Sequence, residues 1–327
     1  MTTITPLSSN AELAPTLLNA LFVPCQITPA IQPALAYTLK RPKSWHTGSA
    51  DLTHPLGLTC LGSFTDDVQS TVSIQAISLK REISAGDWLK YYALTLSKPI
   101  LTLKPISVNR AHGILQWDSA HREHAATIIH GQWLILISCL TTEAAYQALA
   151  STFKHIITSF ELLNPPEQAT IESRIPYTVA NTLQFAAPAS WQCQSINANN
   201  CTLSQPSAQL KLSVEHKTTV IETAEWLEKQ LDDFPQLKIH NLLHHTRLSS
   251  PNVYFPEGNL MIYAGIEHGE PRELWLTRFE DQYHTVTVAL LTAARTVDFY
   301  LWAVNKRAYG IILESLQKER YSAGSIK

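Results

Sequence analysis

The sequence predicts an α+β protein made of two tandem antiparallel-sheet α/β/α sandwiches, the product of an internal duplication. The main observation is a hairpin-and-helix pattern that occurs twice in the 327 residues. In the first copy, two apolar runs at 125–129 and 133–140 are joined by His130-Gly131-Gln132. Two β-rich runs with a short glycine-containing link are typical of a β-hairpin. The second run is apolar at consecutive positions, which predicts a central strand covered on both faces.

A helix is predicted directly after this hairpin. Thr141 or Thr142 is expected to be its N-cap, and Glu143 its first residue. Apolar residues then recur every three or four positions, which predicts one buried stripe along the helix. The stripe comprises Tyr146, Leu149, Phe153, Ile156, Ile157 and Phe160.

The second copy of the pattern has β-rich runs at 272–279 and 283–290. We expect Thr292 to cap the helix that follows. The apolar stripe of that helix comprises Phe299, Trp302, Tyr309, Ile312, Leu313 and Leu316. Both copies therefore predict the same unit, a hairpin followed by a helix that packs back on the sheet.

Two short motifs support the duplication. A Pro-x-Ser-Trp segment follows a predicted strand at 42–45 and again at 188–191. An acid-Trp-Leu segment lies in a predicted helix of each copy, at 87–89 and 225–227. A period this long, present in only two copies, indicates domain duplication and not a solenoid.

The predicted domain boundaries follow from these copies and from the proline-rich stretches beside them. They are a leader at 1–34, a first domain at 35–164, a linker at 165–181, a second domain at 182–319 and a C-terminal tail at 320–327. Within the leader, residues 10–22 are expected to form a short helix. Its leucine-rich face is interpreted as packing on the first domain and not on a membrane.

Composition and charge narrow the class of protein. The chain is 45% hydrophobic and only 16% charged, below the roughly 25% typical of globular domains. This balance favours large apolar surfaces.

The formal net charge of −2 and the lack of a basic stripe disfavour nucleic-acid binding. No apolar run reaches the ~18–20 residues that would insert directly into a bilayer. The N-terminal residues lack a basic segment, and the cysteines lack a CxxC pair, so we expect a cytoplasmic location.

Reactive motifs do not emerge from the sequence. There is no HExxH or HxH pattern, no GxSxG elbow and no P-loop. The adjacent His244 and His245 are expected to point to opposite faces of a strand. The pairs at 66–67 and 232–233 are interpreted as solvated turn carboxylates. We therefore predict a non-enzymatic protein with no catalytic residues, no metal site and no cofactor.

The tryptophans leave two interpretations open. Trp45, Trp191, Trp88 and Trp226 are interpreted as core residues. The strand tryptophans are interpreted either as core packing or as part of an open, partner-binding sheet face. On the second interpretation, the candidate partner contacts are Trp117, Trp133, Leu212 and Trp275.

The order of elements, the Pro-x-Ser-Trp after the first strand and the long closing helix resemble the PsbP/DcrB-like α/β/α sandwich. The resemblance covers about 37–163 and 182–317, which is nearly the whole chain. Within that superfamily, the cytoplasmic single-domain Eag proteins are chaperones that cradle hydrophobic helices of type VI secretion effectors. This chain departs from them by joining two domains in one polypeptide and by its leader.

The resemblance implies a chaperone or adaptor that shields a hydrophobic segment of a bacterial secretion-system effector. Its partner would be that segment or a component of the secretion apparatus. One alternative is a structural scaffold subunit of a secretion or membrane-associated assembly. The other alternative is an enzyme whose site carries no recognised motif.

Overall fold

The computed structural model describes residues 20–29, 32–48, 57–65, 68–165, 170–181, 183–217, 222–249 and 257–318. The chain divides into two compact units. The first comprises Met1–Lys80 and Ser84–Ile171, and the second comprises Arg81–Ile83 and Glu172–Lys327. Each unit is α+β, and every strand pair in the described residues is antiparallel.

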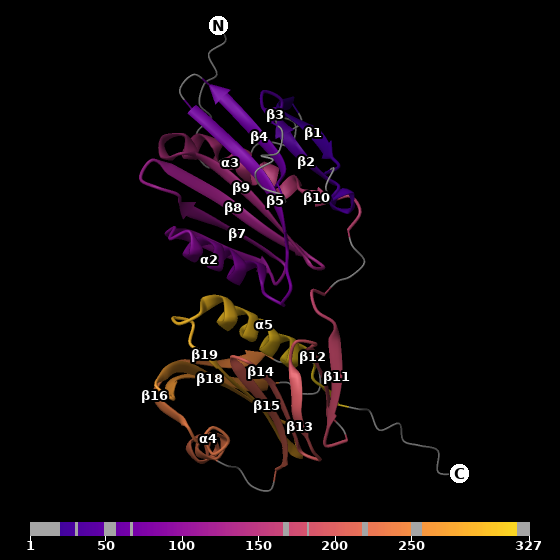
Figure 1. Cartoon of the computed structure of the whole chain (residues 1–327), viewed down its shortest axis with the longest axis vertical. Coiled ribbons are helices and arrows are strands. Elements are labelled where there is room, and N and C mark those ends of the chain that lie inside the picture. The colour runs from indigo at the N-terminus through magenta and orange to yellow at the C-terminus, as the bar shows by residue number, and fades with distance from the viewer. Residues whose placement is uncertain are drawn as a thin grey trace, which may run out of the picture. The chain divides into compact units, whose positions relative to one another are not determined.

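The first unit contains a seven-stranded sheet in the order β3-β4-β5-β9-β8-β7-β6 and a small sheet in the order β1-β2-β10 (Figure 1). Its strands are β1 (Phe22–Ile27), β2 (Tyr37–Pro42), β3 (His46–Gly48), β4 (Gly57–Thr65), β5 (Val68–Ser78), β6 (Ile100–Ser107), β7 (Arg110–Gln116), β8 (His121–His130), β9 (Trp133–Thr142) and β10 (Glu161–Leu162). Its helices are η1 (Pro33–Leu35), α2 (Ala85–Thr95) and α3 (Glu143–Ser159).

The second unit repeats this arrangement, with sheets in the orders β13-β14-β15-β19-β18-β17-β16 and β11-β12-β20. Its strands are β11 (Arg174–Val179), β12 (Leu183–Pro188), β13 (Gln192–Ile196), β14 (Asn200–Gln205), β15 (Ala208–His216), β16 (Leu237–Ser249), β17 (Glu257–Glu267), β18 (Glu270–Glu280), β19 (His284–Ala293) and β20 (Gln317–Lys318). Its helices are α4 (Thr223–Leu231) and α5 (Phe299–Ser315). The two units therefore share one strand order, and α2 and α3 correspond in order to α4 and α5.

The helices of the first unit cover opposite faces of its large sheet. On β8, the Thr127 hydroxyl donates to the Ala85 carbonyl of α2, at 2.9 Å. The neighbouring Ala126 belongs to the core that includes Phe153 and Ile156 of α3. Because successive side chains of a strand point to opposite faces, α2 and α3 pack on different sides of the sheet. The predicted α/β/α layering is present in this unit.

The first hairpin and helix form as predicted. β8 and β9 meet at a turn in which Gly131 has φ +55°, a conformation that glycine adopts without strain. Thr142 is the N-cap of α3, and its hydroxyl accepts a hydrogen bond from the Ala145 amide at 3.3 Å. This confirms the cap at Thr142 and the helix start at Glu143.

The Pro-x-Ser-Trp motif makes the same turn in both units. The Trp45 amide donates to the Pro42 carbonyl at 3.1 Å, and the Trp191 amide donates to the Pro188 carbonyl at 3.0 Å. Both indole rings are buried. The motif therefore ends a small-sheet strand and returns a large side chain to the core.

A serine at the end of each closing helix fixes the helix to the small sheet. The Ser159 hydroxyl accepts from the Lys40 amide of β2 at 2.8 Å and donates to the Ile156 carbonyl. The Ser315 hydroxyl accepts from the Ala186 amide of β12 at 2.9 Å. This shared contact places Lys40 and Ala186 at equivalent positions of the two units.

The predicted cap at Thr292 is wrong. Thr292 is still part of β19, and its hydroxyl accepts from the buried Asn305 side chain at 2.8 Å. The helix begins at Phe299, where the Asp298 carboxylate accepts from the Leu301 amide at 3.0 Å. The cause is strand pairing, because β19 stays hydrogen-bonded between β15 and β18 through Thr292.

The stretches predicted as leader and linker each contribute a strand. β1 pairs with β2, and β11 pairs with β12, in both cases antiparallel. Each added strand contains a proline, Pro24 or Pro176, which a strand at the edge of a sheet tolerates. The helix predicted at 10–22 falls mainly outside the described residues, and β1 begins at its predicted end. The acidic pair at 66–67 also lies outside them.

Candidate functional site

Two of the four predicted partner contacts are buried inside the second unit. Leu212 on β15 is fully buried, and Trp275 on β18 is almost fully buried. The Trp275 indole packs edge-on against Trp302 and Tyr309 of α5. Its Nε1 donates to the Glu273 carboxylate at 3.0 Å. These two residues are therefore part of the core and not of an open sheet face.

The other two predicted contacts, Trp117 and Trp133, are partly exposed but lie far apart. Trp117 follows the end of β7, where the Lys98 ammonium lies 4.5 Å from the centroid of its ring. Trp133 begins β9 and packs against the core of the first unit. The pairings Gln116↔Arg122 and His130↔Trp133 place them at opposite ends of β8. The run from Arg122 to His130 corresponds to roughly 27 Å, so the structure does not bring Trp117 and Trp133 together.

Exposed apolar side chains gather instead at one edge of each large sheet. In the first unit they lie on the edge strand β6, on the loop after it and at the end of α2, which packs over β6, β7 and β8. They are Leu94, Leu96, Leu101, Ile106 and Val108. We call this set the β6 edge. Leu101 and Ile106 lie at the two irregularities in the β6–β7 register, so each is a bulge residue.

The same edge of the second sheet is β16, and it is also apolar and exposed. Its exposed apolar side chains are Leu242 and Leu243 of β16 and Ile266 of the neighbouring β17. We call this set the β16 edge. Two register irregularities again occur, one at His240 and one at Leu243. Beyond them the pairing is regular for six residues, 244–249.

These edges are suited to bind another strand. A sheet edge carries one row of backbone N–H and C=O groups without strand partners, and most proteins shorten or cover such edges. The opposite edges here are short, with three residues in β3 and five in β13. β6 and β16 are longer, at 8 and 13 residues. The bulges interrupt the ladder and so limit which incoming strand fits.

β16 carries basic side chains and no acidic ones. Lys238 is exposed at one end, and the other end carries Arg247, which pairs with Glu257. The exposed His244 and His245 lie between them. Apart from one basic residue, Lys104, β6 has only neutral side chains. The two edges thus share shape and apolar character but differ in charge.

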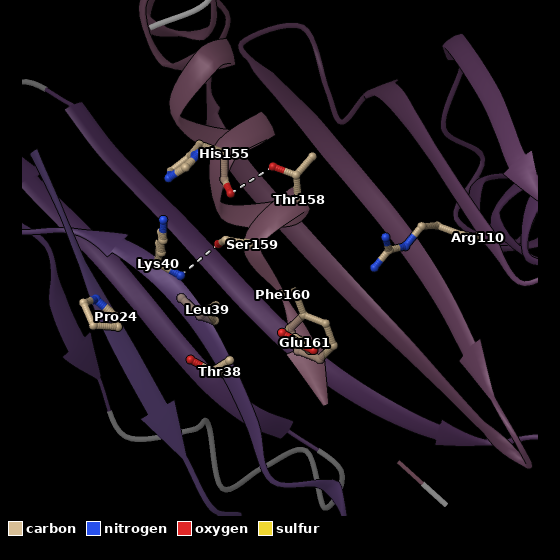
Figure 2. A pocket seen from close by; sticks show the side chains of 10 residues that line it. All are labelled: Pro24, Thr38, Leu39, Lys40, Arg110, His155, Thr158, Ser159, Phe160 and Glu161. Carbon is tan, nitrogen blue, oxygen red and sulfur yellow. Dashed lines mark hydrogen bonds between the residues drawn. The ribbon is translucent and has the colours of Figure 1, made fainter. Parts of the chain in front are cut away.

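A shallow depression in the first unit is a second candidate site (Figure 2). It has a volume of about 670 Å³ and lies beside β2 and the last turn of α3. Leu39 and Phe160 are apolar lining residues, and Lys40, Arg110 and His155 are basic ones. The pKa of His155 is lowered, mainly by burial and to a lesser extent by the nearby charge of Lys40.

Two histidines, His112 and His124, lie together on the α3 side of the first sheet. The rings of His112 and His124 lie 5.8 Å apart, and His124 is buried beside Tyr146. Burial, with the charge of His112 as a lesser cause, lowers the pKa of His124 to about 4. Burial also lowers the pKa of His112.

We expect the first unit to lose stability as the pH falls from about 6.5 to about 4. In that range the unfolded chain takes up a proton on His124 and the folded chain does not, which favours unfolding by about 3 kcal/mol. Burial raises the pKa of Glu123, which offsets part of this loss. Urea unfolding followed at pH 7, 5.5 and 4.5 should show a weaker pH dependence in His124→Leu than in the parent. An equal dependence in both proteins would refute the assignment, and the exposed His46→Leu is the control.

Comparisons with known proteins give structural neighbours only. No family model and no curated protein matches the chain. PsbP (CyanoP) of Synechocystis sp. PCC 6803 is 13% identical, with 48% of this chain and 99% of that chain covered and a TM-score of 0.35. A mutant of the protein Mog1 is 5% identical, with 44% and 95% covered and a TM-score of 0.33. The type VI secretion immunity protein TplEi of Pseudomonas aeruginosa is 9% identical, with 91% and 97% covered and a TM-score of 0.25.

Because the TM-scores are low, the fold and the candidate sites rest on the geometry of this chain alone. No helix in the described part of the chain is both long and apolar enough to cross a membrane.

The sequence analysis does not identify the residues of the β6 edge and the β16 edge. A signal was present in Leu242-Leu243, because two adjacent leucines break the alternation of a strand with one covered face. One of the two must then be exposed or lie in a bulge. For β6, the Ile106-x-Val108 pair after Pro105 carries no comparable signal.

Proposed function

We propose that this protein is a non-enzymatic binding protein that receives an extended segment of a partner protein along its sheet edges. The observation that supports this most is the repeated placement of a long, exposed, apolar edge strand, β6 in one sheet and β16 in the other. An added strand would satisfy the backbone groups of the edge and cover its leucines and isoleucine. Main-chain hydrogen bonds would then give affinity, and the side chains specificity.

We infer a chaperone or adaptor role from the same feature. A hydrophobic segment that would aggregate when exposed is stabilised by pairing with an apolar edge. The partners to assay first are hydrophobic segments of type VI secretion effectors, the class implied by the resemblance of the sequence to Eag proteins. The cytoplasmic location stays a prediction of the sequence.

The test is to place a charge on each edge and to measure capture of co-expressed effector segments. Ile106→Lys and Leu242→Lys change side chains that are 58% and 47% exposed, so folding should be little affected. Ile196→Lys is the matched control, since Ile196 is 50% exposed on the opposite, short edge of the second sheet. We expect at least about tenfold weaker capture for an edge variant, and parent-like capture for the control.

Two results would contradict the proposal. One is unchanged capture in the double variant Ile106→Lys, Leu242→Lys. The other is an equal loss in Ile196→Lys, which would indicate a general effect of added charge. Circular dichroism of each variant checks that its fold is retained.

We also infer that the two units derive from one ancestral domain. Support comes from their shared strand order, the paired Pro-x-Ser-Trp turns and the paired contacts of Ser159 and Ser315. Close relatives provide the test, since equivalent positions of the halves should carry similar residues more often than unrelated positions. Halves without such agreement would argue against duplication.

A further inference from the structure

We propose that the depression beside α3 in the first unit, which Lys40 and Arg110 line, binds a small anionic ligand. The proposal is independent of the strand-binding function. The two basic side chains come from different elements, Lys40 from β2 and Arg110 from the first position of β7. Figure 2 shows them on either side of the end of α3, with the Arg110 guanidinium directed toward Thr158 and Ser159.

The charge balance of the depression favours an anion. Its lining residues include two basic side chains, Lys40 and Arg110, and a single carboxylate, Glu161. His155 adds a ring whose Nε2 is buried and has no hydrogen-bond partner among the described residues. That ring is held edge-on against Phe22, with 4.5 Å between the ring centroids. A buried nitrogen without a partner is uncommon in folded proteins.

The framework beneath these groups is rigid. The Ser159 hydroxyl joins the Lys40 amide to the end of α3, and the Thr158 hydroxyl donates to the Lys154 carbonyl at 2.9 Å. Leu39 and Phe160 are almost fully buried and belong to the lining. The backbone that carries Lys40 is therefore fixed before any ligand binds, which lowers the entropy cost of binding.

The second unit shows that the fold does not require these basic groups. Ser315 is the equivalent of Ser159, and it accepts from the Ala186 amide where Ser159 accepts from the Lys40 amide. Four residues before each serine the helices carry Ile311 and His155 respectively. In the second unit, Ala186 thus stands in place of Lys40 and Ile311 in place of His155, while the serine contact is kept. This contrast indicates a role specific to the first unit.

The chemistry of the site selects carboxylate or phosphate. Guanidinium and ammonium groups form charge-assisted hydrogen bonds to both, and these are stronger than neutral ones. The depression is open to solvent and holds apolar surface beside its cations, so a small amphipathic anion would fit. Inorganic phosphate and octanoate represent the two possible sources of the oxyanion.

Calorimetric titration of the full chain with inorganic phosphate and with octanoate tests the proposal. We expect one of them to bind, with affinity reduced at least about tenfold in Lys40→Ala and in Arg110→Gln. Glu161→Gln should strengthen binding, because it removes the carboxylate. Lys43→Ala is the matched control, since Lys43 is exposed, lies close in sequence and does not line the depression.

The outcome also identifies the ligand. Binding of phosphate alone indicates a phosphate-bearing ligand, and binding of octanoate indicates a carboxylate. The proposal is overturned if neither probe binds at millimolar concentration, or if Lys43→Ala weakens binding as much as Lys40→Ala does. Arg110 is an exposed residue, so Arg110→Gln decides the matter if Lys40→Ala does not fold.

Discussion

Trp191→Ala will lower the free energy of unfolding of the second unit by about 3–5 kcal/mol. The Trp191 side chain is only 1% exposed, and its amide closes the turn with Pro188. Removing the indole leaves a cavity next to the small sheet, where the strands on each side are fixed by hydrogen bonds and cannot close the space. Urea unfolding followed by circular dichroism measures the change.

The control for this prediction is Trp191→Phe. The Trp191 Nε1 is buried and has no hydrogen-bond partner in the described part of the chain, so its removal costs no hydrogen bond and most of the ring volume is kept. Trp191→Phe should therefore cost clearly less than Trp191→Ala. A loss below about 1 kcal/mol for Trp191→Ala would show that the turn, and not the ring, supports this part of the core.

Glu273→Ala is expected to destabilise the second unit by about 2–4 kcal/mol. The buried Glu273 carboxylate accepts hydrogen bonds from Trp275 Nε1 at 3.0 Å and from Trp302 Nε1 at 2.8 Å. The variant would leave two buried indole N–H groups without an acceptor and would empty the space between β18 and α5. Chemical unfolding monitored by tryptophan fluorescence reports on both rings.

Glu270→Ala on the same strand is the matched control, because Glu270 is exposed. Its effect should stay within about 0.5 kcal/mol. Similar losses in the two variants would mean that the carboxylate does not stabilise the tryptophan pair.

Local sequence patterns predicted the two hairpins and the helices that follow them. The spacing of Tyr146, Phe153 and Ile156 is set by the helical repeat and by burial of one face, and both act within a short stretch of chain. The cap at Thr142 follows from the same local rule. At Thr292 the rule fails, because Asp298 is an equally good cap and only the pairing of β19 with its neighbours decides between them.

The candidate sites depend on long-range pairing, which the sequence does not specify. Whether Trp275 faces a partner or the core depends on where α5 packs. Whether Leu242 is exposed depends on β16 being last in its sheet. The depression joins Lys40, Arg110 and His155 from three separate elements, so no single stretch of sequence contains its pattern.

The paired open edges also determine how copies of this protein would associate. A subunit with one such edge stops growing at a dimer, whereas a subunit with two is divalent and can extend into a chain of molecules. Pro105 has no backbone N–H, so β6 lacks one hydrogen-bond donor. The bulge residues at 101 and 106 of β6 and at 240 and 243 of β16 interrupt the regular hydrogen-bond pattern of each strand. We expect these features to disfavour polymerisation of a divalent subunit with itself. Under the proposed function, a partner strand with a matching irregularity would still pair with the edge.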